Sequence, residues 1–141
     1  MRSALRLAVG TVILFGTWAC AGTPGPGQAD YPFNLSGAYA GEMAVEGQYF
    51  SVGMDVQTRQ GGDLAGTYEV TSPVSMSGEV TGSVQADTVR FSLNYMNPMD
   101  GCGGTVDGTG TIEEGGGAFS GRMRVNDSCA GYISGTFSLK K

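Results

Sequence analysis

The chain has 141 residues, of which 25 are glycine, 5 are proline and none is histidine, and its formal net charge is −5. This length suits one domain, and the negative charge disfavours binding to the phosphate backbone of nucleic acids. The lack of histidine removes the most common general base and the most common ligand of transition metals. We therefore expect no nucleic-acid partner, and most hydrolase and zinc chemistry is disfavoured.

Residues 1–19 have the pattern of a signal peptide. Arg2 and Arg6 give the segment a positive start, and a mostly apolar run follows over residues 7–18. This run is shorter than the stretch of about 20 residues that spans a bilayer core. The segment is therefore expected to direct export and then to be removed, not to stay as a membrane helix.

The end of the apolar run, Thr-Trp-Ala-Cys at residues 17–20, resembles the lipobox of bacterial lipoproteins. The resemblance implies that Cys20 becomes the lipid-modified first residue of the mature chain. Ala21 stands where an aspartate retains such lipoproteins in the inner membrane, so the resemblance implies the outer membrane. The alternative is ordinary export with cleavage before Gly22, which would give a secreted or soluble periplasmic protein.

Two further cysteines, Cys102 and Cys129, remain when Cys20 is acylated or removed. An even number of cysteines in an oxidising compartment predicts a disulfide. A redox-active pair is disfavoured, because the two are far apart in sequence and the chain has no Cys-x-x-Cys motif.

Residues 20–33 are rich in proline and glycine, with Pro24, Pro26 and Pro32. Such a composition is typical of a flexible tether that buries no core of its own. The folded domain is therefore expected over residues 34–141.

In this domain apolar and polar residues alternate with a period of two, which is typical of strands that bury one face. In residues 50–57, for example, Phe50, Val52 and Met54 alternate with small or polar residues. No segment keeps a helical period. The pattern predicts eight strands, at about residues 35–45, 50–57, 64–71, 74–85, 88–95, 105–113, 118–126 and 131–140.

Short polar or glycine-rich connections, such as residues 60–63 and 114–117, join the expected strands. Consecutive strands with short turns are antiparallel neighbours. The sequence therefore predicts an all-β domain, a single eight-stranded antiparallel up-and-down barrel, with a β-sandwich as the alternative. In that barrel the connections that carry Cys102 and Cys129 lie at the same end, where the two residues can meet.

The outward positions of the expected strands carry serine, threonine and charged residues, so we expect a soluble barrel and not a membrane-spanning one. A recurring pattern of an apolar residue, a small or polar residue and glycine, as at residues 35–37 and 133–135, points its glycines inward. Two explanations stay open. The glycines either let the strands bend while aromatic rings cover the bare backbone, or they leave room for a ligand.

The expected strands show no catalytic arrangement. By alternation, none of their inward positions carries Asp, Glu, Lys or Arg, so neither a buried base nor a pair of carboxylates is expected. A glycine-rich phosphate loop with its lysine is missing from the sequence as well. We therefore expect a protein that is not an enzyme, with no catalytic residue, no metal site and no cofactor.

Methionine and aromatic side chains cluster at inward positions near the end that carries the two cysteines. Such side chains form adaptable apolar pockets. The residues expected to line a site for a small apolar ligand are Met43, Phe50, Tyr68, Met76, Tyr95 and Met123. The alternative is ordinary filling of the barrel, because an eight-stranded interior is just wide enough for side chains to close it.

Two segments resemble the opening strands of avidin-like and lipocalin-like barrels. Residues 37–39 (Gly-Ala-Tyr) match a Gly-x-aromatic strand, and residues 64–68 (Leu-Ala-Gly-Thr-Tyr) match the end of the hairpin that follows it. The resemblance implies a small β-barrel. Tyr39 stands where the family has Trp, and the family's biotin sites are walled by Trp, so biotin binding does not carry over.

These observations lead to two functional hypotheses. The first is an exported lipoprotein that touches the membrane only through its lipid anchor and whose barrel binds a small apolar ligand without catalysis. The second is a structural or protein-interaction module of the cell envelope, with a filled core and an exposed apolar contact patch.

Overall fold

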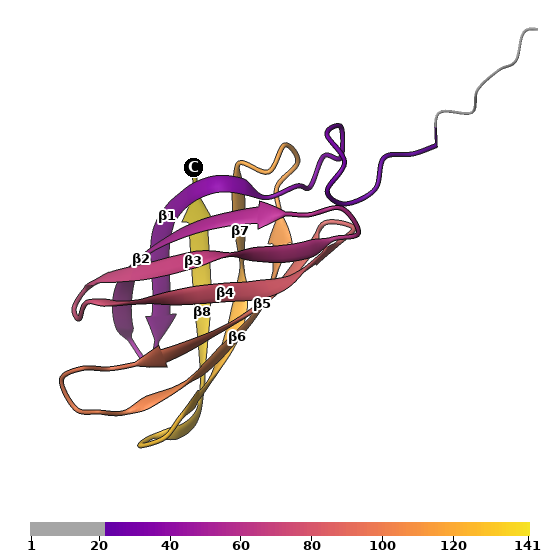
Figure 1. The fold of residues 1–141 in the computed structure, drawn as a ribbon. Coiled ribbons are helices and arrows are strands. Elements are labelled where there is room, and N and C mark those ends of the chain that lie inside the picture. The colour runs from indigo at the N-terminus through magenta and orange to yellow at the C-terminus, as the bar shows by residue number, and fades with distance from the viewer. Residues whose placement is uncertain (1–21) are drawn as a thin grey trace, which may run out of the picture.

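The computed structural model describes residues 22–141 (Figure 1), so the expected signal peptide and Cys20 lie outside the described residues. The chain forms a closed barrel in which antiparallel strands follow one another in chain order. The strands are β1 (Ser36–Val45), β2 (Gln48–Thr58), β3 (Asp63–Ser72), β4 (Met76–Gln85), β5 (Thr88–Met96), β6 (Gly103–Ile112), β7 (Ala118–Asp127) and β8 (Gly131–Lys140). The predicted up-and-down barrel is confirmed, and pairing of β1 with β8 excludes the sandwich.

Each strand buries alternate side chains because its sequence alternates. In β7, Phe119, Met123 and Val125 are buried, whereas Ser120 and Arg122 are exposed. The buried side chains of all strands form one core inside the barrel, and polar residues cover its outside. Within residues 22–141, no helix is long and apolar enough to cross a membrane.

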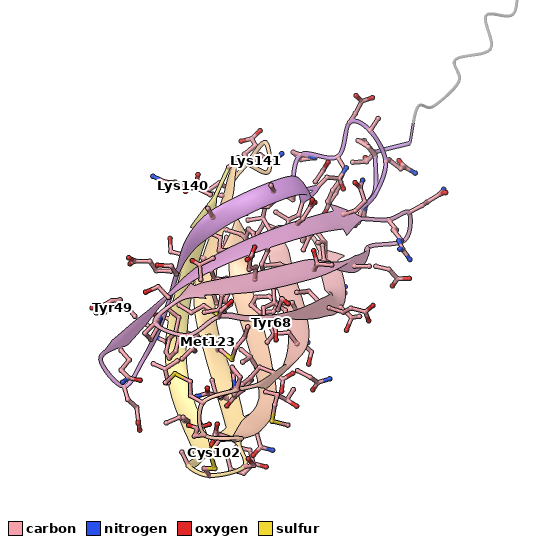
Figure 2. All side chains as sticks on the ribbon, turned by 60° about the vertical axis from the view of Figure 1, so that its left-hand side comes forward. Tyr49, Tyr68, Cys102, Met123, Lys140 and Lys141 are labelled. Atoms are coloured by element: carbon pink, nitrogen blue, oxygen red, sulfur yellow. A yellow bond between two sulfur atoms is a disulfide. The ribbon has the colours of Figure 1, made fainter. Side chains whose placement is uncertain are left out.

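The barrel has two ends, and we name each by its residues. The mouth is formed by the connections at residues 46–47, 73–75, 97–102 and 128–130. The closed end is formed by the connections at residues 59–62, 86–87 and 113–117, by residues 25–35 and by Lys141. In Figure 2, Cys102 marks the mouth, and Lys140 and Lys141 mark the closed end.

Residues 25–33 lie against the closed end, which differs from the flexible tether that their composition predicts. The main-chain N–H of Gly61 donates a 3.2 Å hydrogen bond to the carbonyl of Pro26. The N–H of Gly115 donates a 2.7 Å bond to the carbonyl of Pro32. Two connections of the barrel thus hold the segment through its main chain.

Two aromatic side chains explain why this segment docks. Tyr31 and Phe33 pack edge to face, with ring centroids 5.9 Å apart, and both contact the core. The Tyr31 hydroxyl also donates to the carbonyl of Ala86 at 2.8 Å, and Leu35 is fully buried. Burial of the apolar area of these side chains stabilises the docked segment. The proline and glycine content of the segment does not reveal this contribution. Residues 25–33 are therefore packed on the closed end of the barrel, and we call them the docked cap.

A column of four aromatic rings fills the half of the barrel next to the closed end. Tyr39 packs edge to face on Phe119, with centroids 5.1 Å apart, and Phe119 contacts Phe137 at 5.9 Å. Phe137 in turn packs edge to face on Phe91 at 5.0 Å. The Phe91 ring covers Gly108 of β6, where a Cβ atom would collide with it. In this half, the inward glycines make room for aromatic rings.

Candidate ligand site

The mouth half of the barrel holds a cavity of about 530 Å³. All six residues that alternation places there line it, namely Met43, Phe50, Tyr68, Met76, Tyr95 and Met123. Most of the remaining wall is aliphatic, and Figure 2 shows Tyr68 and Met123 between the closed end and Cys102. The structure thus brings the predicted residues of six strands, β1 to β5 and β7, together around one space.

On one part of the cavity wall, the side chains that face inward are smaller than the rings of the aromatic column. Val106, Val125 and Ile133 lie side by side on β6, β7 and β8. The next inward position of β6 toward the mouth is Gly104. An eight-stranded interior is just wide enough for side chains to fill it, so small side chains on three neighbouring strands leave space that larger ones would occupy.

The barrel wall is split between β4 and β5 at the mouth. The ladder between them ends at the pair of Val80 and Leu93. β4 nevertheless begins at Met76 and β5 continues to Met96, so each strand extends beyond the ladder. Figure 1 shows the two strands diverging toward their mouth ends.

Tyr68 of β3 bridges this split. Its ring lies against Gly78 of β4, where the glycine leaves space for it. Its hydroxyl donates a hydrogen bond of 2.6 Å to the main-chain carbonyl of Asn94 in β5. Burial raises the pKa of Tyr68 above its ordinary value, so the hydroxyl remains a donor. The side chain therefore connects two strands where their own ladder has ended.

A hydrogen bond between Tyr95 of β5 and Asp127 of β7 forms the polar centre of the mouth. The two residues flank Gly104 of β6 in one row of the sheet, so the tyrosine reaches across a position without a side chain. Its hydroxyl donates to Oδ2 of Asp127. Oδ1 accepts the main-chain N–H groups of Cys129 and Ala130, both at 2.8 Å. Three donors thus hold the carboxylate at the cavity wall.

The same contacts move the pKa values of Asp127 and Tyr95 away from neutral pH. The hydrogen bond from Tyr95, followed by those from the main chain of Ala130 and Cys129, lowers the pKa of Asp127. Burial, followed by the hydrogen bond and the charge of Asp127, raises the pKa of Tyr95. At neutral pH the pair is therefore a carboxylate and a neutral phenol.

The predicted disulfide between Cys102 and Cys129 is present at the mouth, with Cα atoms 5.7 Å apart. It continues the β6–β7 ladder, in which the N–H of Ser128 donates to the carbonyl of Gly103 at 2.8 Å. Within residues 22–141, Cys102, Asp127 and Cys129 are the one group of side chains with metal-ligand chemistry close together. Since both sulfurs are joined to each other, this group is a disulfide beside a carboxylate.

Asp127 is the mouth residue that sequence reasoning missed. The predicted strand ends at residue 126, but β7 continues to Asp127, which pairs with Gly104. One more step of the alternation that places Met123 and Val125 inward would have found it. The expectation of no charged inward position is therefore wrong here, because three hydrogen bonds and the nearby solvent offset the cost of placing a charge there.

Large hydrophobic side chains that remain exposed gather at the mouth. Among residues 22–141 they are Tyr49, Met96, Met99 and Tyr132, each at or beside a mouth connection. Tyr49 and Tyr132 are 66% and 77% exposed, and Figure 2 shows Tyr49 pointing away from the barrel. We call these four residues the apolar rim.

Comparison with known proteins supports the fold. No protein-family model matches the chain, and no curated protein matches its sequence. A redesigned β-barrel, mFAP1, solved bound to DFHBI, is similar with a TM-score of 0.55 and 20% identity, over 76% of this chain and 94% of that chain. A second redesigned β-barrel has a TM-score of 0.50 and 23% identity, over 76% of this chain and 90% of that one. At this identity the likeness shows a shared small-barrel fold.

Proposed function

We propose that this protein is an exported bacterial lipoprotein whose barrel binds a small, mostly apolar molecule in the mouth cavity without altering it chemically. The observation that carries the proposal is the contrast within one barrel: aromatic rings fill the half next to the closed end, whereas the mouth half holds a cavity of about 530 Å³. That volume falls in the range of small-molecule sites, about 300 to 1,000 Å³.

The chemistry of the wall supports a binding role. Methionine side chains such as Met43, Met76 and Met123 adapt to ligands of different shape. Apolar area on these walls is removed from water when a ligand fills the cavity, which favours binding. The mFAP1 barrel, solved with DFHBI bound, is an example of a small molecule held by a protein of this fold.

A non-catalytic role fits the titrating groups of the cavity. A general acid or base works best with a pKa near the working pH. The pKa of Asp127 is lowered and that of Tyr95 is raised, so both move away from neutrality. Their hydrogen bond thus favours a fixed polar anchor over proton transfer.

Lipid modification at Cys20 rests on the sequence, and the fold is compatible with it. The docked cap at residues 25–33 places the N-terminal side of the domain at the closed end. An anchor at Cys20 would therefore hold the closed end toward the membrane and the mouth away from it. We propose the outer membrane as the location.

Ligand binding is tested by native mass spectrometry of protein extracted gently from its source, which should retain a small molecule on the barrel. A matched pair of variants assigns that molecule to the cavity. Ile133→Trp adds a large ring to the cavity wall, whereas Tyr132→Trp exchanges one exposed ring for another at the neighbouring position. The bound mass should be lost only in Ile133→Trp. Retention by both variants would remove the mouth cavity as the site.

The anchor is tested by the mass and location of the mature chain. We expect an acylated N-terminal Cys20 in the membrane fraction, and release of the protein from membranes in the Cys20→Ser variant. An unmodified mature chain that begins at Gly22 would instead establish ordinary export.

The apolar rim favours a second function, that of an interaction module of the cell envelope. Tyr49, Met96, Met99 and Tyr132 are exposed large hydrophobic side chains at one end of the barrel, and exposed apolar side chains of this kind are typical of contact surfaces. If this function is the correct one, replacing Tyr132 by Ser should abolish cross-linking to a partner in cells while leaving the small-molecule content of the purified protein unchanged.

A further inference from the structure

The charged groups that line the cavity are all of one sign. Three carboxylates, those of Glu46, Asp100 and Asp127, line it, and neither lysine nor arginine does. The four mouth connections contain no lysine or arginine either. A molecule entering the mouth therefore meets negative charge that the barrel itself does not neutralise there.

Asp127 is built into the wall of this cavity. In the eight strands of the described chain it is the one inward position with a charged side chain. Its carboxylate accepts hydrogen bonds from Tyr95, Cys129 and Ala130. An ionised carboxylate has about four acceptor positions, so one is left for a donor in the cavity.

Tyr95 presents the same chemistry to the cavity. Its hydroxyl proton is committed to Asp127, which leaves the hydroxyl oxygen free to accept. At this point of the wall, the tyrosine oxygen and the carboxylate can therefore both accept a hydrogen bond from a ligand that carries a donor. Beside them the wall is apolar, with Leu93, Val106 and Val125.

We infer that the ligand is a cationic amphiphile, with an ammonium-type head held at Asp127 and Tyr95 and an apolar body in the cavity. This inference rests on the proposed function and specifies its ligand class. A primary ammonium group supplies both the positive charge and the donors that the two side chains lack. A carboxylate head would instead meet three negative charges without a compensating cation.

Three probes of equal chain length test the inference on the purified mature protein. Decylamine, decanol and decanoate have chains of about ten carbons, suited to a cavity of this size. At neutral pH they differ in the head group, which is a cationic donor in the amine, a neutral hydroxyl in the alcohol and an anionic acceptor in the carboxylate. Isothermal titration calorimetry should give the order amine, alcohol, carboxylate, with the amine binding at least about tenfold more tightly than the carboxylate.

Two matched variants assign the preference to Asp127. Asp127→Asn keeps the size and the acceptor oxygen of the side chain but removes its charge, and should reduce the preference for decylamine over decanol by about tenfold. Asp107→Asn changes the net charge equally on the exposed face of β6, and should leave that preference unchanged. If both variants lose the preference for decylamine equally, the preference depends on net charge alone, and its assignment to Asp127 is wrong.

The outcomes separate the inference from the proposed function. Binding of all three probes without preference for the amine, or with preference for decanoate, would overturn the inference and leave the apolar cavity as a binding site. Failure of every probe to bind would remove the proposed function and the inference together. Because the order of the probes is measured on the wild-type protein, the test holds even if Asp127→Asn does not fold.

Discussion

The closed end and the mouth are built from the same eight strands but use their inward positions differently. At the closed end, aromatic rings, a docked cap and Lys141 over the Tyr39 ring, 5.3 Å from its centroid, leave the axis filled. At the mouth, aliphatic side chains and glycine leave a cavity, and a disulfide joins two connections. One half of a small barrel can therefore supply packing while the other half carries an unfilled site.

The largest expected difference between the two ends is in core packing. Phe119→Ala removes a fully buried ring from the aromatic column and should lower the free energy of unfolding by about 3 to 5 kcal/mol. Phe50→Ala removes a partly buried ring that already borders the cavity, and should cost less than half as much. Urea denaturation of both variants checks this. Equal losses would mean that the mouth contributes as much packing as the closed end.

The disulfide is expected to be the main source of stability at the mouth. Its sequence separation of 27 residues predicts about 3 to 4 kcal/mol from restriction of the unfolded chain. The double variant with Cys102→Ser and Cys129→Ser should therefore melt at a lower temperature than the wild type. Wild-type protein in reductant is the control and should melt like the variant. An unchanged melt, with two titratable thiols in the untreated parent, would contradict the bridge.

The hydrogen bonds of Tyr39 at the closed end and of Tyr95 at the mouth should differ in how much they stabilise the fold. The Tyr39 hydroxyl donates a buried hydrogen bond of 2.6 Å to the carbonyl of Gly116 and accepts a partly buried one of 3.2 Å from the N–H of Ser36. Tyr39→Phe leaves both partners unsatisfied and should cost about 1 to 3 kcal/mol. Tyr95→Phe should cost less, because Asp127 keeps its main-chain donors and access to water. Chemical denaturation of the two variants measures the difference, and a larger loss for Tyr95→Phe would reverse the ranking.

The smallest expected effect is a pH dependence confined to the mouth. The folded-state pKa of Asp127 is lowered, so its contribution to stability is present above the pKa of an unfolded aspartate, about 3.9, and is lost as pH falls below it. The folded-state pKa of Tyr95 is raised, so its contribution is present below about 10 and is lost at higher pH. At neutral pH the free energy of unfolding of the wild type should exceed that of Tyr95→Phe, and this difference should shrink at both acid and alkaline pH. If this difference in unfolding free energy stays constant from acid to alkaline pH, the hydrogen bond between Tyr95 and Asp127 does not contribute as expected.

Much of the candidate site could be predicted from sequence. Alternation alone placed Met43, Tyr68 and Met123 at inward positions near the cysteine-bearing end, and all three line the cavity. It failed at Asp127, because the end of a strand depends on how far its ladder with the neighbouring strand continues. The docked cap was missed for a related reason, since Tyr31 and Phe33 dock on residues that are distant in the chain.

The sequence by itself determined the fold class, the inward and outward faces and the pairing of Cys102 with Cys129, because a period of two and short connections leave few other arrangements. Only the tertiary structure decided that the mouth is hollow and that Tyr95 meets Asp127 across Gly104. Whether a barrel axis is filled depends on the summed volumes of side chains from several strands at one height, and that sum exists only after the strands have closed into a ring.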